Sequence, residues 1–550
     1  MTFMKNFKYI AGSIFLFFFI ISSLETKPQS SSFFNENKKI ITSFKISDSL
    51  KILSKTKLIK NKYLKKGFIN CSIDSIVKTK TGYNVFLYVG KKYFWNKINI
   101  IEDSNLLYLS KLKNKEADFF EIKNIIETQK QKLNNNGYPF AEVYISNYNI
   151  RDSLISLQIK IEKKNYIVFD SIYFDKKNVR VSEKYLQNYL RFKQNNAYNK
   201  QLIQKIDEKL QNTAFLELKS PSEIEFHPKS CDLYLYLKNK KTNNFSGILG
   251  FSNQNKKLSL AGKIELGVGN FFGSGDYYYF KWYNTKNQGQ FLNTNISLPY
   301  ILGTKLGIEE ELAIKKKDTS YLHLDNLFTT KYFFSGSDNI GITYKYILSF
   351  PFSDDTTYKS FSTNYTGFSF TIDHRDDLFF TSKGILLNLT LQAGLKKENK
   401  NFEQRGLVSF AIDYFIPVTK NSSILLKNTT QSIIGKNIVA NELLNFGGFN
   451  SIRGFEQDEF YATSFSIFTS EYRFLAGNRY IIYSFADYGF YIDTVVENIK
   501  NFKNLLGIGL GFSIKTKSGI LSISYAIGKY ENDNLNFLNS KLHFGLNSYF

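Results

Sequence analysis

From about residue 241 to the last residue, apolar and polar side chains alternate one by one over many short stretches. In the stretch 257–266, Leu258, Leu260, Ile264 and Leu266 alternate with polar neighbours such as Lys257, and the pattern returns at 408–416 and over the last ten residues. Successive side chains of a β-strand point to opposite faces, so each stretch predicts a strand that separates an apolar from a polar medium.

The apolar medium has to be argued separately, because a soluble all-β domain would alternate in the same way. The region runs for about 310 residues without a convincing helix, and aromatic clusters stand at strand ends, at 277–280, 332–334, 379–380 and 549–550. Such clusters are typical of membrane-interface girdles, and lipid accepts only sheets that close on themselves. At ~9–11 residues per spanning strand, plus turns and loops, the length predicts roughly sixteen strands. The expected fold class is mostly β, with a C-terminal transmembrane antiparallel β-barrel over residues 241–550.

The preceding residues follow a different pattern, which repeats at roughly 75 residues: a strand, a helical segment, a small-residue turn and two further strands. The clearest copy, 93–164, has a strand at 94–100, a helix at 119–133 and a strand at 153–161. A second copy occupies 165–240, with helices at 181–192 and 200–210, and a less complete one occupies 45–92. This order and size resemble those of POTRA modules, which implies tandem α+β modules in the periplasm.

The N-terminus has the features of a secretion signal. Lys5 and Lys8 precede an apolar run at 10–21, which is too short to span a membrane comfortably. We expect a signal peptide over residues 1–26 and a linker over 27–44, although an uncleaved anchor is an alternative. No cysteine follows the apolar run, so the sequence does not indicate lipidation.

One arginine stands out in the predicted barrel. It lies in the string Ile452-Arg453-Gly454-Phe455, which follows Gly447-Gly448 and precedes isolated acids at Glu471 and Asp487. A charge in a nearly dry place is costly unless it is paired. We therefore expect this loop to fold inward and to be held by a salt bridge, rather than to be a flexible surface loop.

Several motifs of the C-terminal half, taken in order, resemble the barrel of the BamA/TamA outer-membrane assembly family. They are Asn270-Phe271-Phe272-Gly273-Ser274-Gly275, Pro299-Tyr300-Ile301-Leu302-Gly303, Asp373-His374-Arg375-Asp376-Asp377 with Gly384, the Arg453 string, Ser470-Glu471-Tyr472, Phe485-Ala486-Asp487 and Gly507-Ile508-Gly509. The resemblance implies that Arg453 tips an inward-folded sixth extracellular loop, with Glu471 and Asp487 as its partners. It also implies an assembly signal on the last strand, at Gly545 and Phe550. Chain length and the number of modules favour the TamA-like branch.

Other classes of function find little support in the sequence. The net charge of +24 comes from evenly spread lysines without a basic block, so nucleic-acid binding is not indicated. Cys71 and Cys231 fall in different modules, which makes a disulfide unlikely to form, and the four histidines lack ligand spacing, so we expect no metal and no cofactor. Asp373, Arg375 and Asp376 belong to a run of consecutive residues, 373–377, in an alternating region, so that neighbours point to opposite faces and cannot converge on one substrate atom. Asp373, Arg375 and Asp377 are expected to share a face, as a structural charge ladder in the lumen or at a strand end.

The sequence thus predicts a non-enzymatic protein of the bacterial outer membrane, with its N-terminal modules in the periplasm. By resemblance, it inserts or translocates unfolded outer-membrane or secreted clients without ATP, in contact with lipids and with periplasmic or inner-membrane accessory proteins. Two alternatives remain: a two-partner secretion transporter with one dedicated substrate, and a passive channel. A transporter of that kind would usually carry an N-terminal plug helix, and residues 36–60 are too ambiguous to be identified as one.

Overall fold

The computed structural model describes residues 30–548 except 36–39, 46–48, 80–81, 103–104, 255–256, 286–288, 318–319, 353–357, 493–501, 517–518 and 532. The predicted signal peptide and Phe550 lie outside the described residues. The chain divides into two compact units: residues 1–167 with 197–200, and residues 168–196 with 201–550. Among the described residues, no helix is both long enough and apolar enough to cross a membrane.

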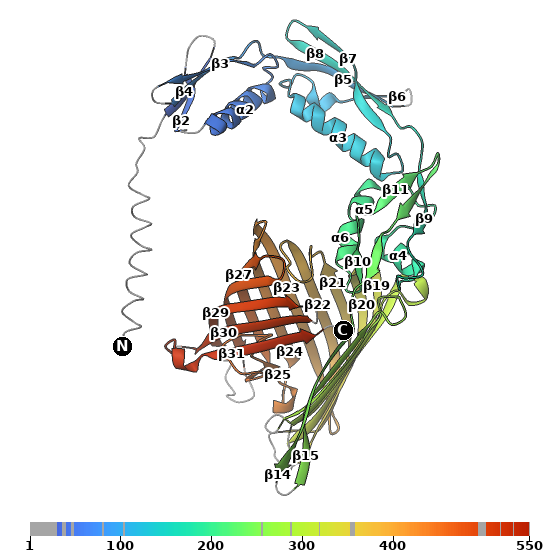
Figure 1. Ribbon diagram of the computed structural model, residues 1–550, viewed down its shortest axis with the longest axis vertical. Coiled ribbons are helices and arrows are strands. Elements are labelled where there is room, and N and C mark those ends of the chain that lie inside the picture. Colours follow the sequence, from blue (N-terminus) through green and yellow to red (C-terminus); the bar gives the residue numbers. More distant parts are fainter. Residues whose placement is uncertain are drawn as a thin grey trace. The chain divides into compact units, whose positions relative to one another are not determined.

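The first unit contains two small α+β modules (Figure 1). In the first, the sheet order is β2-β1-β4-β3, formed by β1 (Ser30–Phe34), β2 (Ile40–Lys45), β3 (Ser72–Thr79) and β4 (Gly82–Tyr88). The helix α2 (Ser49–Lys65) packs Ile52 and Ile59 against Phe33, Val85 and Leu87. The segment 27–44 was expected to be a linker, and this expectation is wrong for Ser30–Phe34, because β1 pairs in parallel with β4 and completes the sheet.

The second module has the sheet order β6-β5-β8-β7, formed by β5 (Phe94–Glu102), β6 (Asn105–Tyr108), β7 (Glu142–Arg151) and β8 (Leu154–Glu162), with the short helix η1 (Ser110–Leu112). Its helix α3 (Phe119–Asn135) begins where Asp118 accepts a hydrogen bond from the backbone N–H of Phe120 at 2.8 Å. The core gathers Trp95, Ile122 and the inward residues of β5 and β8.

A third module lies in the second unit, together with the barrel. It comprises β9 (Val168–Tyr173), α4 (Glu183–Leu190), α5 (Lys200–Gln204), α6 (Ile206–Gln211), β10 (Leu216–Leu218), β11 (Glu223–Phe226), β12 (Ser230–Tyr234) and β13 (Leu237–Asn239). Its strands form a sheet of order β11-β12-β9 and a pair β10-β13. Neither cysteine forms a disulfide, and both are buried. Burial raises the pKa of the Cys231 thiol to about 12, which leaves this thiol protonated and unreactive.

The largest element is a sixteen-stranded sheet in which each strand pairs antiparallel with the next (Figure 1), as predicted from the length of the region. Its strands are β14 (Asn244–Gln254), β15 (Lys257–Gly269), β16 (Tyr277–Thr285), β17 (Gly289–Leu298), β18 (Leu306–Lys317), β19 (Tyr321–Ser335), β20 (Asp338–Pro351), β21 (Phe361–Asp373), β22 (Gly384–Glu398), β23 (Asn401–Thr419), β24 (Ser422–Gly435), β27 (Ser464–Ala476), β28 (Tyr480–Ile492), β29 (Phe502–Thr516), β30 (Gly519–Tyr530) and β31 (Lys541–Ser548). The first and last members, β14 and β31, lie close together without being paired among the described residues, and we call this junction the seam.

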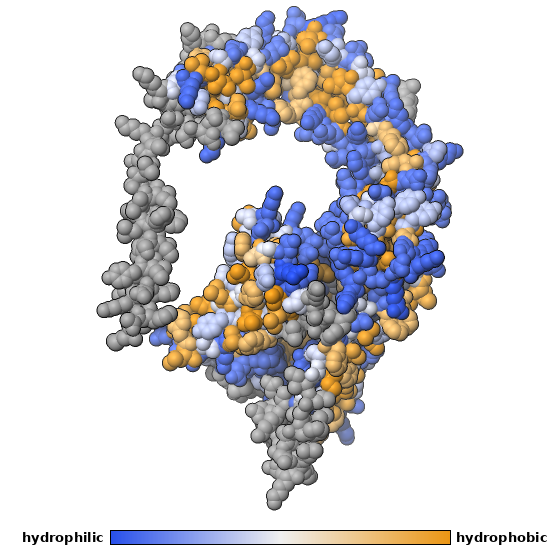
Figure 2. Space-filling view, viewed as in Figure 1, coloured by the Kyte–Doolittle hydropathy of each residue, from blue (hydrophilic) through white to orange (hydrophobic). Residues whose placement is uncertain are grey.

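Alternation places apolar side chains on the outer face of the sheet and a mixture of charged and apolar side chains on the inner face. On β20, Ile340, Ile342 and Tyr344 are exposed on the outer face, whereas Lys345 and Ile347 line an inner cavity. Figure 2 shows apolar side chains gathered over β29–β31, where Phe502, Leu510 and Phe544 are exposed. An apolar exterior of this kind fits lipid as the surrounding medium.

The third module packs on the turns at one end of the barrel. Asn188 of α4 donates from Nδ2 to the carbonyl of Gly303 at 2.7 Å, and the ring of Tyr185 stands edge-on to that of Tyr300 with 5.3 Å between the ring centres. Asn270 donates to the carbonyl of Arg180 at 2.6 Å. Ser182 caps the N-terminus of α4, because its side chain accepts a hydrogen bond from the backbone N–H of Tyr185 at 3.1 Å. We call this contact the module dock.

Candidate functional site

A long connection between β24 and β27, residues 436–463, starts from the end of the barrel opposite the module dock; we call it the latch loop. It contains the short helix η3 (Ala440–Glu442) and a two-stranded hairpin of β25 (Leu444–Phe446) and β26 (Phe460–Ala462). Its tip is Ile452-Arg453-Gly454-Phe455, and Ile452, Arg453 and Phe455 are all buried there. The loop therefore folds inward, as the sequence predicted.

Arg453 is held by both predicted acids. Its Nε and Nη2 donate to the two carboxylate oxygens of Asp487 at 2.8 and 2.6 Å, and its Nη1 donates to Oε1 of Glu471 at 2.6 Å. The guanidinium lies 3.5 Å from the centre of the Phe485 ring. Two parallel hydrogen bonds to one carboxylate match the fork of arginine, which lysine cannot reproduce.

Asp487 is fully buried, and its carboxylate accepts two further hydrogen bonds beside those from the guanidinium. The backbone N–H of Arg453 donates to Oδ2 of Asp487 at 3.0 Å, and the hydroxyl of Thr469 donates to Oδ1 at 2.8 Å. A buried pair of this kind is costly to break, since removing one partner leaves an unpaired charge, at about 3–5 kcal/mol. Asp487 therefore fixes both the backbone and the side chain of Arg453.

Three glycines give the latch tip room to approach the wall. Gly454 has a φ of +93°, and a Cβ there would lie 2.5 Å from the backbone nitrogen of Gly528 on β30. A Cβ on Gly507 of β29 would lie 2.0 Å from the carbonyl oxygen of Arg453. The loop backbone thus lies directly against two strands that have no side chain at the contact. Gly454 was named from the sequence as part of the arginine string, whereas Gly528 was not singled out.

An apolar cluster fixes the rest of the latch loop. Ile452 is fully buried and packs with Phe446, Phe455 and Phe460 of the loop. The wall contributes Phe465, Ile467, Tyr491 and Leu505 to the same cluster. The polar pair at Arg453 and this cluster together define one position of the loop, because neither can be kept if the tip moves.

A second ion cluster, which the sequence analysis missed, holds the base of the loop. Glu442 of η3 accepts from Nζ of Lys396 at 2.8 Å and from Nε of Arg405 at 3.0 Å. The side chains of Lys396 and Arg405 are fully buried, and further carboxylates lie close, with Glu398 3.0 Å from Lys396 and Glu403 3.0 Å from Arg405. The polarity is the reverse of that at the tip, since the loop supplies the acid and the wall supplies the bases. Basic residues at inward positions of β22 and β23 were the available signal for this cluster.

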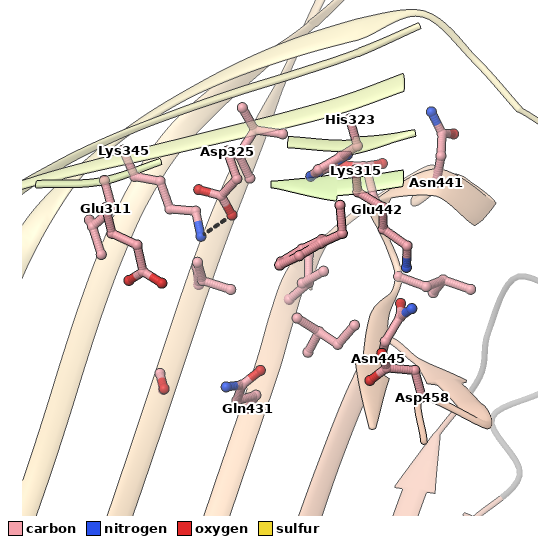
Figure 3. A pocket seen from close by; sticks show the side chains of 18 of the residues that line it. Glu311, Lys315, His323, Asp325, Lys345, Gln431, Asn441, Glu442, Asn445 and Asp458 are labelled. Atoms are coloured by element: carbon pink, nitrogen blue, oxygen red, sulfur yellow. Dashed lines mark ion pairs between the residues drawn. The ribbon is translucent and has the colours of Figure 1, made fainter. Parts of the chain in front are cut away.

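The latch loop also borders a cavity of about 1240 Å³ inside the barrel. Figure 3 shows Asn441, Glu442, Asn445 and Asp458 of the loop on one side, facing side chains of the barrel wall. On the wall, Lys345 and Asp325 form an ion pair of 2.7 Å. The cavity is thus lined by charged and apolar side chains together, and the loop forms part of its boundary.

The segment Asp373-His374-Arg375-Asp376-Asp377 lies in the turn between β21 and β22, facing the third module. Arg375 forms an ion pair of 2.7 Å with Asp373, whereas Asp376 and Asp377 accept hydrogen bonds from backbone N–H groups at 382 and 379. The expected alternation of faces is therefore wrong after Asp373, because the strand ends there. The expected ladder with Asp377 does not form. Gly384 allows the turn to close, since a Cβ there would lie 2.1 Å from the carbonyl oxygen of His374.

Of the predicted terminal signal, Gly545 lies on the inner face of β31. One group of potential metal ligands occurs among the described residues: Glu225, His227 and Asp232, whose ligand atoms lie within 4.8 Å of one another. These atoms already have partners, because Nε2 of His227 lies 3.0 Å from Asp232 and the Tyr234 hydroxyl donates to Glu225 at 2.7 Å. The latch loop contains no comparable set within the described part of the chain.

Comparison with known proteins gives a family match over the barrel. The model of the Omp85 superfamily domain matches residues 254–550. Among solved structures, CdiB from Acinetobacter baumannii is 14% identical over 92% of this chain and 100% of its own, with a TM-score of 0.50. CdiB from Escherichia coli is 13% identical over 90% and 97%, also at 0.50. BamA from Haemophilus ducreyi lacking POTRA domains 1–3 is 15% identical over 77% and 92%, at 0.43. No curated protein sequence matches the chain.

Proposed function

This chain belongs to the Omp85 superfamily, and from that premise we propose that it inserts or assembles unfolded client proteins at the bacterial outer membrane, without ATP and without covalent chemistry. The proposal assigns client capture to the periplasmic modules and client entry to the seam between β14 and β31. The latch loop keeps the barrel interior in one arrangement during this work. The TamA-like branch is part of the proposal, supported by three modules before the barrel.

The observation that carries the proposal is the edge strand β7 of the second module. It ends the sheet order β6-β5-β8-β7 and pairs only with β8 among the described residues. The C-terminal half of β7 is exposed to solvent: the exposed fraction is 67% for Tyr148 and 43% for Ile150. An exposed edge that carries apolar side chains can accept an extended client strand through backbone hydrogen bonds, while the side chains give some selectivity.

The role of α2 also supports assembly over secretion of one dedicated substrate. Residues 36–60 were weighed from the sequence as a plug helix, and α2 (Ser49–Lys65) begins within this range. Ile52 and Ile59 are buried against the sheet of the first module. A helix whose apolar face forms the core of a module is not free to serve as a plug.

The test combines depletion of the protein with a census of outer-membrane proteins. We expect many barrel proteins to fall together, and expect the double variant Tyr148→Asp, Ile150→Lys to reproduce part of that loss because charges block strand addition. The matched control is Leu58→Lys, which changes an equally exposed apolar residue on α2 (60% accessible). Loss of a single secreted protein would instead indicate a dedicated transporter, and altered solute permeability alone would indicate a passive channel; either result would overturn the proposal.

A further inference from the structure

We propose that the latch loop braces the closing strand β31, so that the loop has to move before β31 can leave the seam. The residues of β31 that take part are distinct from the partners of Arg453. Three alternate inward positions of β31, namely 541, 543 and 545, each contact the latch loop, whereas Leu542 and Phe544 between them are exposed on the outer face.

The central contact joins His543 to the latch tip. The backbone N–H of Gly454 donates to Nε2 of His543 at 3.2 Å. The imidazole therefore accepts at Nε2, which requires the neutral ring with its proton on Nδ1. Gly454 directly follows Arg453, whose backbone and side chain are both fixed by Asp487. The ion pair between Arg453 and Asp487 thus orients the backbone N–H of Gly454 toward β31.

Two further contacts flank His543. The ring of Phe449 lies 6.2 Å from the His543 ring, centre to centre, and a Cβ on Gly545 would lie 3.0 Å from that phenyl ring. Gly545 thereby lets the phenylalanine rest on the strand backbone. At the other end, Lys541 pairs with Glu456 at 2.9 Å. This last pair is exposed and contributes little, so His543 and Phe449 carry most of the brace.

The closing strand has reason to need such support. Among the described residues, β31 pairs with β30 over eight positions, from 541 to 548, and with no second strand, whereas the interior strand β30 pairs with both β29 and β31. A terminal strand with fewer backbone pairs separates more easily than an interior one. His543 is accordingly a positioning residue, acting on the seam through the backbone. The brace itself is a property of the barrel, and only its role in client entry rests on the proposed function.

Hydrogen exchange of the full chain in lipid nanodiscs, measured on peptides from β30–β31 and from β22–β24, tests the brace. His543→Leu removes the acceptor, so we expect several-fold faster exchange in β30–β31 and unchanged exchange in β22–β24. His543→Gln keeps an acceptor and should exchange like the unmodified protein. Leu542→Ala is the matched control on the outer face of the same strand. Should His543→Leu fail to fold, Phe449→Ala removes the brace from the loop side and should give the same selective increase.

Unchanged exchange in His543→Leu, or an equal rise in all strands, would overturn the brace. Client levels in the same variants separate the two proposals. Faster exchange with altered client assembly supports both, whereas faster exchange with normal client levels supports the brace and counts against client entry through the seam.

Discussion

At the scale of single residues, the chemistry of Arg453 predicts that lysine cannot replace it. Lys at 453 would lose the two parallel hydrogen bonds to Asp487 and the stacking on Phe485, while retaining the charge. We expect Arg453→Lys to lower stability by about 1.5–3 kcal/mol and Arg453→Ala by about 3–5 kcal/mol. The measurement is the temperature at which the folded, fast-migrating form disappears on a semi-native gel. Equal midpoint temperatures for the unmodified protein and both variants would show that the ion pair of Arg453 does not stabilise the barrel.

The close approach at Gly507 gives a second prediction. A methyl group there would lie 2.0 Å from the carbonyl oxygen of Arg453, so Gly507→Ala should displace the latch tip while the sheet still forms. The matched control is Gly406→Ala on β23, where a Cβ would meet only the side chain of Ile434, at 3.3 Å. We expect protease cleavage within 447–459 to become faster in Gly507→Ala alone. Equal cleavage in both variants would contradict the packing described for the tip.

The sequence predicted Arg453, Glu471 and Asp487 because a single charge in an apolar setting demands partners, and isolated acids lay nearby on the following strands. Glu442 gave no such signal. Its partners Lys396 and Arg405 come from strands well before the loop, and they face it only because of the register of β22 with β23, in which Gly394 pairs with Arg405. Whether Glu442 reaches these two bases depends on how the latch loop folds back against the wall, and no pattern in the sequence specifies that path.

At the scale of secondary-structure elements, the module dock depends on Tyr300. Its hydroxyl donates to the carbonyl of Gly336 at 2.5 Å, and its ring contacts Tyr185 of α4 and stacks on Phe333. Tyr300→Ala should loosen α4 from the barrel turns, at a cost of about 3–5 kcal/mol, as for other large aromatic truncations. Limited proteolysis of residues 175–240 measures this, with Tyr332→Ala as the control, since Tyr332 is 45% exposed on the outside. Similar cleavage in the two variants would contradict the dock.

Most elements were predictable and a few were not, for reasons visible in their residues. The helix expected at 119–133 is α3 (Phe119–Asn135), because its apolar residues recur at helical spacing. The strand β1 was missed, because Ser30-Ser31-Ser32-Phe33-Phe34 shows no alternation and is a strand only through its pairing with β2 and β4. The dock was equally hidden, since Tyr185 and Tyr300 are far apart in the sequence.

At the scale of the whole molecule, the latch loop controls how much of the lumen is open. Its residues border a cavity of about 1240 Å³. Replacing residues 437–459 by a short Gly/Ser connection should therefore empty the lumen and raise single-channel conductance in planar bilayers several-fold. Arg453→Ala should give more frequent openings without a larger maximum, because the loop remains present. Unchanged conductance after the replacement would show that the loop does not limit the passage.

The module dock has a consequence for how the chain becomes folded. Since α4 and the turns at 270, 303 and 336 share buried contacts, residues 168–550, with the short segment 197–200, should refold in one cooperative transition. A chain that begins at residue 241 would expose Tyr300 and Phe333 to solvent and should aggregate. A chain that begins at residue 168 retains the third module and should refold in detergent. The boundary between the two folding units of this protein therefore lies before the third module, at residue 168, and not at the start of β14.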